Sequence, residues 1–187
     1  WISDDTDAAE RVRIQYGTSM CYPISSMGSH VSVVPNHQLN RITSLHTRAN
    51  VAYFGTFGYE LDLNKLTDEE IAEVKAQIIY MKEYRELIQF GNFYRLKSPF
   101  DGNETVWMTV SEDKRKALVF WYRERNVVNA EFTRVRLQGL DPDLIYRNEY
   151  NETENYGDEL MNLGLLTTDC TAGEPTSEDE PCTDYEY

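Results

Sequence analysis

The first ten residues of the chain concentrate carboxylate side chains. The acids are Asp4, Asp5, Asp7 and Glu10. Acids just before and within the first turn of a helix cap its free N–H groups and complement its dipole. One cap needs only one such side chain, so capping leaves an excess. A carboxyl group can also act as a general acid or base, and the excess makes Asp4 and Asp5 candidates for that chemistry.

The elements that would position these acids can be predicted from the residues that follow. Residues 7–16 predict a helix, because Asp7 and Glu10 have the spacing of a capping box and Gly17 stands where a C-terminal glycine would end the helix. Residues 18–34 form a mostly uncharged run. This run predicts a strand buried on both faces, as in the parallel sheets of α/β proteins.

A long helix is the clearest element further along the chain. Residues 37–63 are rich in glycine and aromatic side chains and predict irregular structure with short elements. Thr67 and Glu70 then form a second capping box. Apolar residues follow with helical spacing, namely Ile71, Val74, Ile78 and Met81. We expect this helix to end near residues 90–91.

After Gly91 the pattern changes to short runs of β-branched and aromatic residues separated by turn residues. The runs cover residues 93–100, 105–112, 116–124 and 133–140. They predict a small antiparallel sheet or sandwich. The fold class is therefore α/β followed by all-β. We expect an α/β part over residues 1–90, a β domain over 91–166 and an acidic tail over 167–187.

The acidic tail and the overall charge restrict the possible partners. The tail carries seven acids and no base, a composition that predicts disorder. The net charge of -14 argues against binding to nucleic acid or to an anionic membrane surface. No apolar run approaches the roughly 18–20 residues that span a bilayer.

The cysteines and histidines do not predict a metal site or a disulfide framework. Cys21 lies in an apolar stretch and is interpreted as a small buried hydrophobe. Cys170 and Cys182 lie in the tail, where they could pair with each other. The three histidines lack metal-ligand spacing; they are His30, His37 and His46. We therefore expect neither a metal nor another cofactor.

Several motifs of the sequence resemble those of glycoside hydrolase family 36, the bacterial and fungal α-galactosidases, and they occur in the same order. The stretch WISDDTDAAERVRIQYGTSMCYPISSMGSHVSVVPNHQ matches the family around its acid/base aspartate, with Trp-x-Ser-Asp-Asp-Thr-Asp, Ser-Met-Gly-x-His-Val-Ser and Pro-Asn-His-Gln all present. The resemblance continues through FGYELDL, FYRLKSPFDGNETVWMTVSEDK, RVRLQGLDPD and GDELMNLGL, and so covers residues 1–165. Such a chain would hold the last part of a (β/α)8 TIM barrel followed by an incomplete C-terminal antiparallel β-sandwich, truncated at both ends.

The resemblance also implies an activity and roles for individual residues. The resemblance implies an enzyme that hydrolyses terminal α-galactosides such as melibiose and raffinose. It implies retention of configuration at the anomeric carbon, which uses two carboxyl groups about 5–5.5 Å apart. By matching positions, Asp4 is the implied acid/base, Asp5 is the alternative and Asp7 is a cap. Asp4 would lie after a strand and before a helix, at the end of the barrel where active sites sit. Trp1 resembles a tryptophan that lines the sugar pocket, although ordinary barrel packing accounts for it equally well.

The chain also departs from the family pattern. The Lys-x-Asp context of the nucleophile and the Cys-Ser-Gly-Gly-Gly loop do not occur, and a tyrosine replaces the usual serine before Gly157. We therefore expect the chain alone to lack activity. His30 and His37 either hydrogen-bond backbone, hold a loop or take part in catalysis. The alternative function is a non-catalytic carbohydrate-binding or oligomerisation module on the sandwich, over residues 92–150.

Partners and compartment follow from the same resemblance. The expected ligands are α-galactoside oligosaccharides, and the parent enzyme is expected to be a homo-oligomer. A bacterial parent would be cytoplasmic and a fungal one could be secreted. Asn103 and Asn151 each begin an Asn-Glu-Thr sequon, which matters only in a secreted eukaryotic protein.

Overall fold

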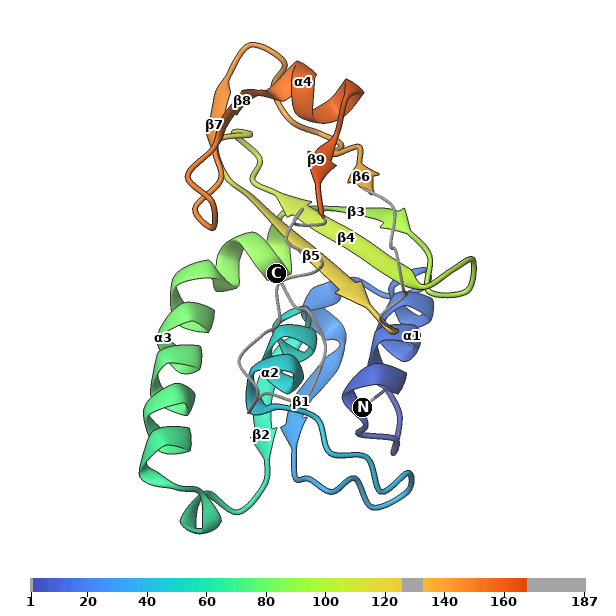
Figure 1. The fold of residues 1–187 in the computed structure, drawn as a ribbon, viewed down its shortest axis with the longest axis vertical. Helices are drawn as coiled ribbons and strands as arrows, with labels where there is room; N and C mark the ends of the chain where they lie inside the picture. Colours follow the sequence, from blue (N-terminus) through green and yellow to red (C-terminus); the bar gives the residue numbers. More distant parts are fainter. Residues whose placement is uncertain (1, 126–132, 168–187) are drawn as a thin grey trace, which may run out of the picture. The chain divides into compact units, whose positions relative to one another are not determined.

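The computed structural model describes residues 2–125 and 133–167 (Figure 1). The chain divides into two compact units, residues 1–90 and 91–187. The N-terminal unit contains α1 (Ala8–Ser19), η1 (Ile24–Ser26), β1 (Gly28–Ser32), α2 (Leu45–Tyr53), β2 (Thr56–Glu60), η2 (Leu63–Lys65) and α3 (Asp68–Phe90). Within the described residues, no helix has both the length and the apolar character needed to cross a bilayer.

Strands β1 and β2 pair in parallel, and α2 connects them (Figure 1). The register places His30 opposite Gly58 and Ser32 opposite Glu60. Successive side chains of a strand point to opposite faces. The helix-covered face of this pair therefore consists of Ser29, Val31, Phe57 and Tyr59, and the polar face carries His30, Ser32 and Glu60.

All three α-helices of the unit contact the helix-covered face. The Ser29 hydroxyl donates to Oε1 of Gln15 on α1 at 2.8 Å. The Phe57 ring stacks on Tyr53 of α2 with centroids 5.0 Å apart. The Tyr59 hydroxyl donates to a side-chain oxygen of Gln77 on α3 at 2.8 Å. Polar contacts thus join apolar packing in orienting the helices around the strand pair.

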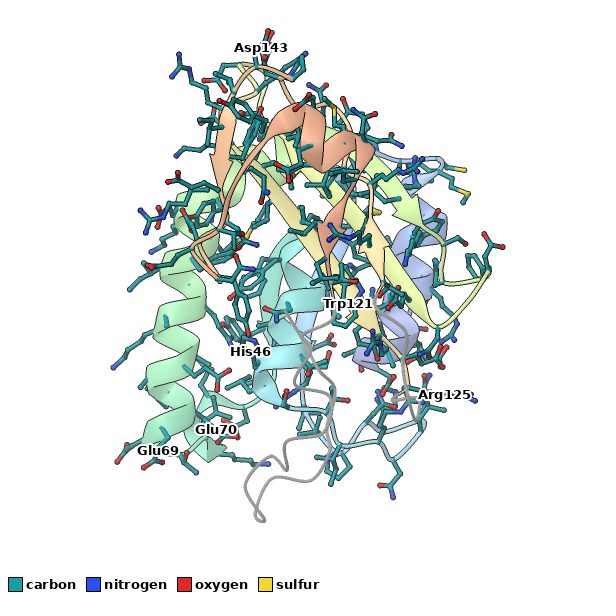
Figure 2. All side chains as sticks on the ribbon, turned by 45° about the horizontal axis from the view of Figure 1, so that its top comes forward. His46, Glu69, Glu70, Trp121, Arg125 and Asp143 are labelled. Carbon is teal, nitrogen blue, oxygen red and sulfur yellow. The ribbon has the colours of Figure 1, made fainter. Side chains whose placement is uncertain are left out.

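Helix α3 confirms the prediction made from its capping box. The Thr67 backbone N–H donates to Glu70 Oε2 at 2.8 Å, and the Glu70 N–H donates back to Thr67 Oγ1 at 3.2 Å. Figure 2 labels Glu70 at this end of the helix. The helix ends at Phe90, as expected.

Three expectations for the first half of the chain were wrong in detail. Helix α1 continues through Gly17 to Ser19, where Tyr16 and Ser19 are buried, so packing holds a last turn that the glycine was expected to end. The strand predicted within residues 18–34 shortens to β1, because a turn and η1 come first. Cys21 lies in that turn and is exposed, not buried.

Helix α2 falls in residues 37–63, which were expected to be irregular structure with short elements, without a specific helix. The Ser44 hydroxyl caps it by accepting the Thr47 N–H at 3.0 Å. Thr47 and Arg48 are buried along with the apolar residues of the helix, and Arg48 donates to the backbone oxygens of Ser32 and Ser44. Since polar and apolar residues are buried together, the helix has little of the amphipathic pattern from which helices are predicted.

The C-terminal unit is built on an antiparallel sheet in the order β3-β4-β5. These strands are β3 (Asn92–Lys97), β4 (Glu104–Val110) and β5 (Ala117–Arg123). They coincide with the first three runs of β-branched and aromatic residues, as predicted, except that β3 and β4 each begin one residue before their runs. The remaining elements are β6 (Arg134–Val135), β7 (Ile145–Arg147), β8 (Glu154–Tyr156), α4 (Gly157–Asn162) and β9 (Leu165–Leu166).

The core of this unit lies between the sheet and a second layer that includes β6 and α4. It consists of Val106, Met108, Val110, Trp121, Val135, Leu137, Leu140 and Leu160. The fourth predicted run does not extend the sheet. Only Arg134 and Val135 form a strand there, and they pair with β9. The residues after them, Leu137 and Leu140, use their apolar side chains to cover the sheet.

Candidate active site

A chain of local hydrogen bonds shapes the segment before α1. The Asp5 N–H donates to Ser3 Oγ at 3.0 Å, and the Asp7 N–H donates to Asp5 Oδ1 at 2.9 Å. The Glu10 N–H donates to Asp7 Oδ1 at 3.1 Å. Asp4 lies at the bend of this segment and is exposed, whereas Asp5 is half-buried and Asp7 is buried. The three aspartates therefore occupy three different environments.

Asp7 caps α1, as predicted, but the capping box is only half formed. The Asp7 N–H is bound by Asp5 instead of by the Glu10 side chain. The Glu10 carboxylate lies 3.7 Å from Arg13 and 4.0 Å from Arg41. Part of the acidic excess thus has a structural role, since Asp5 takes the place that capping-box spacing assigned to Glu10.

A second loop, residues 33–44, is attached to the segment that holds Asp4. This loop follows the carboxyl end of β1. Its Asn36 donates from Nδ2 to Thr6 Oγ1 at 3.3 Å, and its Arg41 forms an ion pair with Asp7 at 2.5 Å. Because the loops after the carboxyl ends of parallel strands form the active sites of α/β folds, Asp4 lies where a catalytic group would be expected.

Arg11 of α1 holds the other side of the segment. It is buried, and its guanidinium donates to the Ser3 carbonyl at 3.0 Å and to the Gly28 carbonyl at 3.4 Å. Burial lowers the pKa of Arg11, while the negative charges of Asp5 and Glu60 oppose that shift. The residue directly before Asp4 is thus tied to the first residue of β1 by a buried cation.

His30 lies on the polar face of the strand pair. Its Nδ1 is 3.7 Å from Oε2 of Glu60 on the neighbouring strand. Burial lowers the pKa of His30; Glu60 acts against this effect and Arg11 adds to it. The histidine is therefore a candidate hydrogen-bonding group on this face, and its role in catalysis remains a hypothesis.

The other residues considered from the sequence fall elsewhere. His37 is exposed in the loop after β1, and His46 on α2 is within 3.1 Å of the Asn50 amide. Trp1, the candidate for the sugar pocket, lies outside the described residues, as do Cys170 and Cys182. Across residues 2–125 and 133–167, no group of three or more His, Cys, Asp or Glu side chains is arranged to hold a metal ion.

The sequence did not reveal the basic residues of this site. Arg11 and Arg41 were not predicted to have a role, and Asn36 was noted only as part of a motif. Arg11 follows Asp7 by four positions, so helical spacing alone could have placed it on the same face of α1. Arg41 is 34 positions from Asp7, and no local pattern connects the two.

Comparison with known proteins identifies the family. Residues 1–91 match the Melibiase family, and residues 104–185 match the glycosyl hydrolase family 36 C-terminal domain. The α-galactosidase AgaA of Geobacillus stearothermophilus is 53% identical over 165 residues, which are 88% of this chain and 22% of that protein. The chain belongs to glycoside hydrolase family 36.

Solved structures of α-galactosidases agree with this assignment. The α-galactosidase from Lactobacillus brevis superposes with a TM-score of 0.92 at 47% identity, covering 100% of this chain and 25% of that one. An AgaA variant in complex with raffinose has a TM-score of 0.87 at 50% identity, covering 90% of this chain and 23% of that one. This family 36 chain therefore combines the end of a melibiase catalytic domain with the C-terminal β domain, and it spans about a quarter of these relatives.

Proposed function

We propose that the N-terminal unit supplies the acid/base half of a retaining α-galactosidase, with Asp4 as the acid/base residue. The observation that carries the proposal is the different exposure of the three aspartates. Asp7 is buried in an ion pair and a helix cap, and Asp5 is half-buried with its Oδ1 accepting a backbone N–H, whereas Asp4 is exposed at the bend that precedes them. A proton donor must be able to reach the leaving-group oxygen, and Asp4 has the required exposure.

The proposed chemistry requires two carboxyl groups. In a retaining mechanism one carboxylate attacks the anomeric carbon, while the other carboxyl protonates the departing oxygen and then activates water. Asp4 would perform the second role in both steps. The first role requires a carboxylate in the Lys-x-Asp context typical of the family, and this sequence contains no such motif. We therefore propose that the 187-residue chain does not hydrolyse galactosides unless the other half of the site is supplied.

The proposed substrates are oligosaccharides that end in α-linked galactose. This part of the proposal is supported by relatives, since crystals of AgaA variants hold raffinose in one case and stachyose in another. Asp5 is the alternative acid/base, and the test must distinguish it from Asp4.

A chimera provides the test. Residues 1–167 of this chain would replace the matched segment of AgaA, which supplies the rest of the site. Asp4→Asn and Asp5→Asn would be compared on nitrophenyl α-galactoside, whose leaving group needs little protonation, and on raffinose, whose leaving group needs it. Removing a general acid costs about 10²–10⁴ in rate when protonation limits the reaction. We therefore expect Asp4→Asn to lose this factor on raffinose and much less on the nitrophenyl substrate.

The outcomes separate the alternatives. Azide should partly restore nitrophenyl turnover in Asp4→Ala, because it needs no general base to attack the glycosyl-enzyme. Equal loss on both substrates would contradict the acid/base role of Asp4. The same selectivity in Asp5→Asn instead would move the role to Asp5. An unsubstituted chimera without activity would contradict the proposed function.

A further inference from the structure

The connection between the loop after β1 and the Asp4 segment has a consequence for catalysis. We propose that Arg41, held by Asn36, is a positioning residue that fixes the location of the Asp4 carboxyl. This inference rests on the proposed function, because it assumes that Asp4 is the acid/base.

A single carboxylate oxygen joins three parts of the unit. Oδ1 of Asp7 accepts both the Glu10 N–H at 3.1 Å and Arg41 Nη1 at 2.5 Å. The Asp7 side chain is 1% exposed, whereas that of Arg41 is 42% exposed. The partly solvated guanidinium of Arg41, in the loop after β1, therefore binds the buried carboxylate of Asp7 at the start of α1. Asp7 lies three residues after Asp4.

The loop is built so that Arg41 reaches this point. Asn36 is buried, and its Oδ1 accepts the N–H groups of Gln38 and Leu39, both at 2.9 Å. Its backbone N–H donates to the Arg41 carbonyl at 2.8 Å, which closes the turn. Its Nδ2 donates to Thr6 Oγ1 at 3.3 Å. One asparagine thus folds the loop and attaches it beside Asp7.

Asp4 is held from both sides as a result. Ser3, on one side, is fixed by Arg11 through its carbonyl oxygen. Thr6 and Asp7, on the other side, are fixed by the loop. The side chain of Asp4 is therefore exposed, while the residues on both sides of it are held by hydrogen bonds and an ion pair. This arrangement suits a carboxyl group that must be positioned accurately next to the leaving-group oxygen.

Loss of Arg41 should loosen the segment that follows Asp4, because Arg41 holds Asp7. A buried carboxylate without its cation is unfavourable, so the Asp7 side chain would change its contacts or move toward water. Either change weakens the start of α1 and lets the Asp4 backbone shift. A displacement of about 1 Å in a catalytic group can cost about 10²-fold in rate.

An ion pair of this kind could instead serve stability alone. The two roles differ in what they affect. A purely structural loss lowers the amount of active protein and reduces the rate on every substrate by the same factor. A displaced acid lowers the rate most where the leaving group needs its proton.

Two measurements test the proposal. On the 187-residue chain, hydrogen–deuterium exchange of residues 2–10 should rise in Arg41→Ala and, to a smaller extent, in Arg41→Lys, which keeps the charge but loses the planar fork. The matched control is Arg147→Ala, which removes an exposed arginine of the C-terminal unit that pairs with Glu152 at 3.1 Å. Exchange of residues 2–10 should not change in this control.

In the AgaA chimera, the same variants would be assayed on raffinose and on nitrophenyl α-galactoside. We expect Arg41→Ala to lose about 10²-fold in kcat/KM on raffinose and clearly less on the nitrophenyl substrate. Guanidinium ion added to Arg41→Ala should recover part of the raffinose rate. Should Arg41→Ala fail to fold, Arg41→Lys decides, with the same substrate selectivity expected at smaller amplitude.

Unchanged exchange over residues 2–10 would overturn the proposal, as would equal losses on the two substrates. The proposed function has a separate outcome. If Asp4→Asn is selective and the Arg41 variants are not, only the positioning role fails; if Asp4→Asn is itself unselective, the acid/base assignment fails.

Discussion

Glu104 of β4 is the centre of a polar cluster in the C-terminal unit. Disrupting this cluster should have a readily measurable effect on stability. Its carboxylate accepts from Lys97 at 2.5 Å, from Arg123 at 2.9 Å and from the Thr133 hydroxyl at 3.0 Å. The side chains of Glu104 and Arg123 are 12% and 11% exposed. Substituting Glu104→Gln keeps the shape but removes the charge and presents an amide N–H to groups that are themselves donors.

The cost can be approximated from these contacts. A hydrogen bond to a charged group contributes about 1.5–3 kcal/mol, and breaking a buried ion pair from one side costs about 3–5 kcal/mol. The amide oxygen can still accept one of the three donors, and Lys97 remains partly solvated. We therefore expect the free energy of unfolding to fall by about 2–4 kcal/mol, a large part of the roughly 5–15 kcal/mol typical of a protein.

The effect should depend on pH with a definite sign. Burial raises the pKa of Glu104, but the hydrogen bonds from Lys97 and Arg123 outweigh burial, so the pKa lies below its ordinary value. The charged cluster thus stabilises the fold above the pKa of an unfolded glutamate, about 4.3. This stabilisation is lost as the pH falls through the lowered pKa of the folded state, where wild type and Glu104→Gln should converge.

Urea unfolding followed by tryptophan fluorescence is the assay. Two of the three tryptophans, Trp107 and Trp121, lie on β4 and β5 of the same sheet, and Figure 2 labels Trp121. With a slope of about 1–3 kcal/mol/M, the midpoint of Glu104→Gln should fall by about 1–2 M at pH 7. Glu152→Gln is the control, because its pair with Arg147 is exposed and should contribute less than about 1 kcal/mol. A loss at pH 7 no larger than in the control, or one that persists unchanged in acid, would refute the reasoning.

Three further predictions concern single groups. Burial raises the pKa of Tyr59 to about 12; Tyr59→Phe should therefore remove one late step from the alkaline absorbance titration, and its contribution to stability should decline as the pH rises from about 10 through about 12. Thr67→Ala should cost about 1 kcal/mol in urea melts followed by circular dichroism, since it removes half of the capping box of α3. In a eukaryotic secretory host, glycosidase digestion and mass spectrometry should find a glycan on Asn151, which is exposed, and not on Asn103, whose amide donates to the Arg125 carbonyl at 2.6 Å.

Where a structure depends on neighbours within a few positions, the sequence was sufficient. The capping box of Thr67 and Glu70 and the apolar spacing after it predicted α3 from its first turn to its end at Phe90. Asp7 was predicted as the cap of α1 for the same reason, since a side chain three residues before an N–H can reach it. The β-branched and aromatic runs predicted β3, β4 and β5 because strand pairing favours such residues wherever a turn brings them together.

Local patterns failed where burial came from elsewhere in the chain. Helix α1 passes Gly17 because its last turn is packed, and α2 was missed because Thr47 and Arg48 are buried by tertiary contacts. Cys21 was expected to be buried because its neighbours are apolar. Because α1 is longer than predicted, Cys21 instead lies in the exposed turn that follows the helix.

For the candidate site, the sequence by itself determined which carboxyl group is proposed for the chemistry, and the tertiary structure decided the setting of that group. The motifs around Asp4 were sufficient to indicate a carboxyl group for acid/base catalysis. They could not show that Asp5 is engaged by the Asp7 backbone, or that Arg41 reaches Asp7 across 34 positions. The physical reason is the distance along the sequence between the interacting groups. Caps and turns join groups a few residues apart, whereas Asp7 and Arg41 pair only once the loop after β1 has folded back to the start of α1.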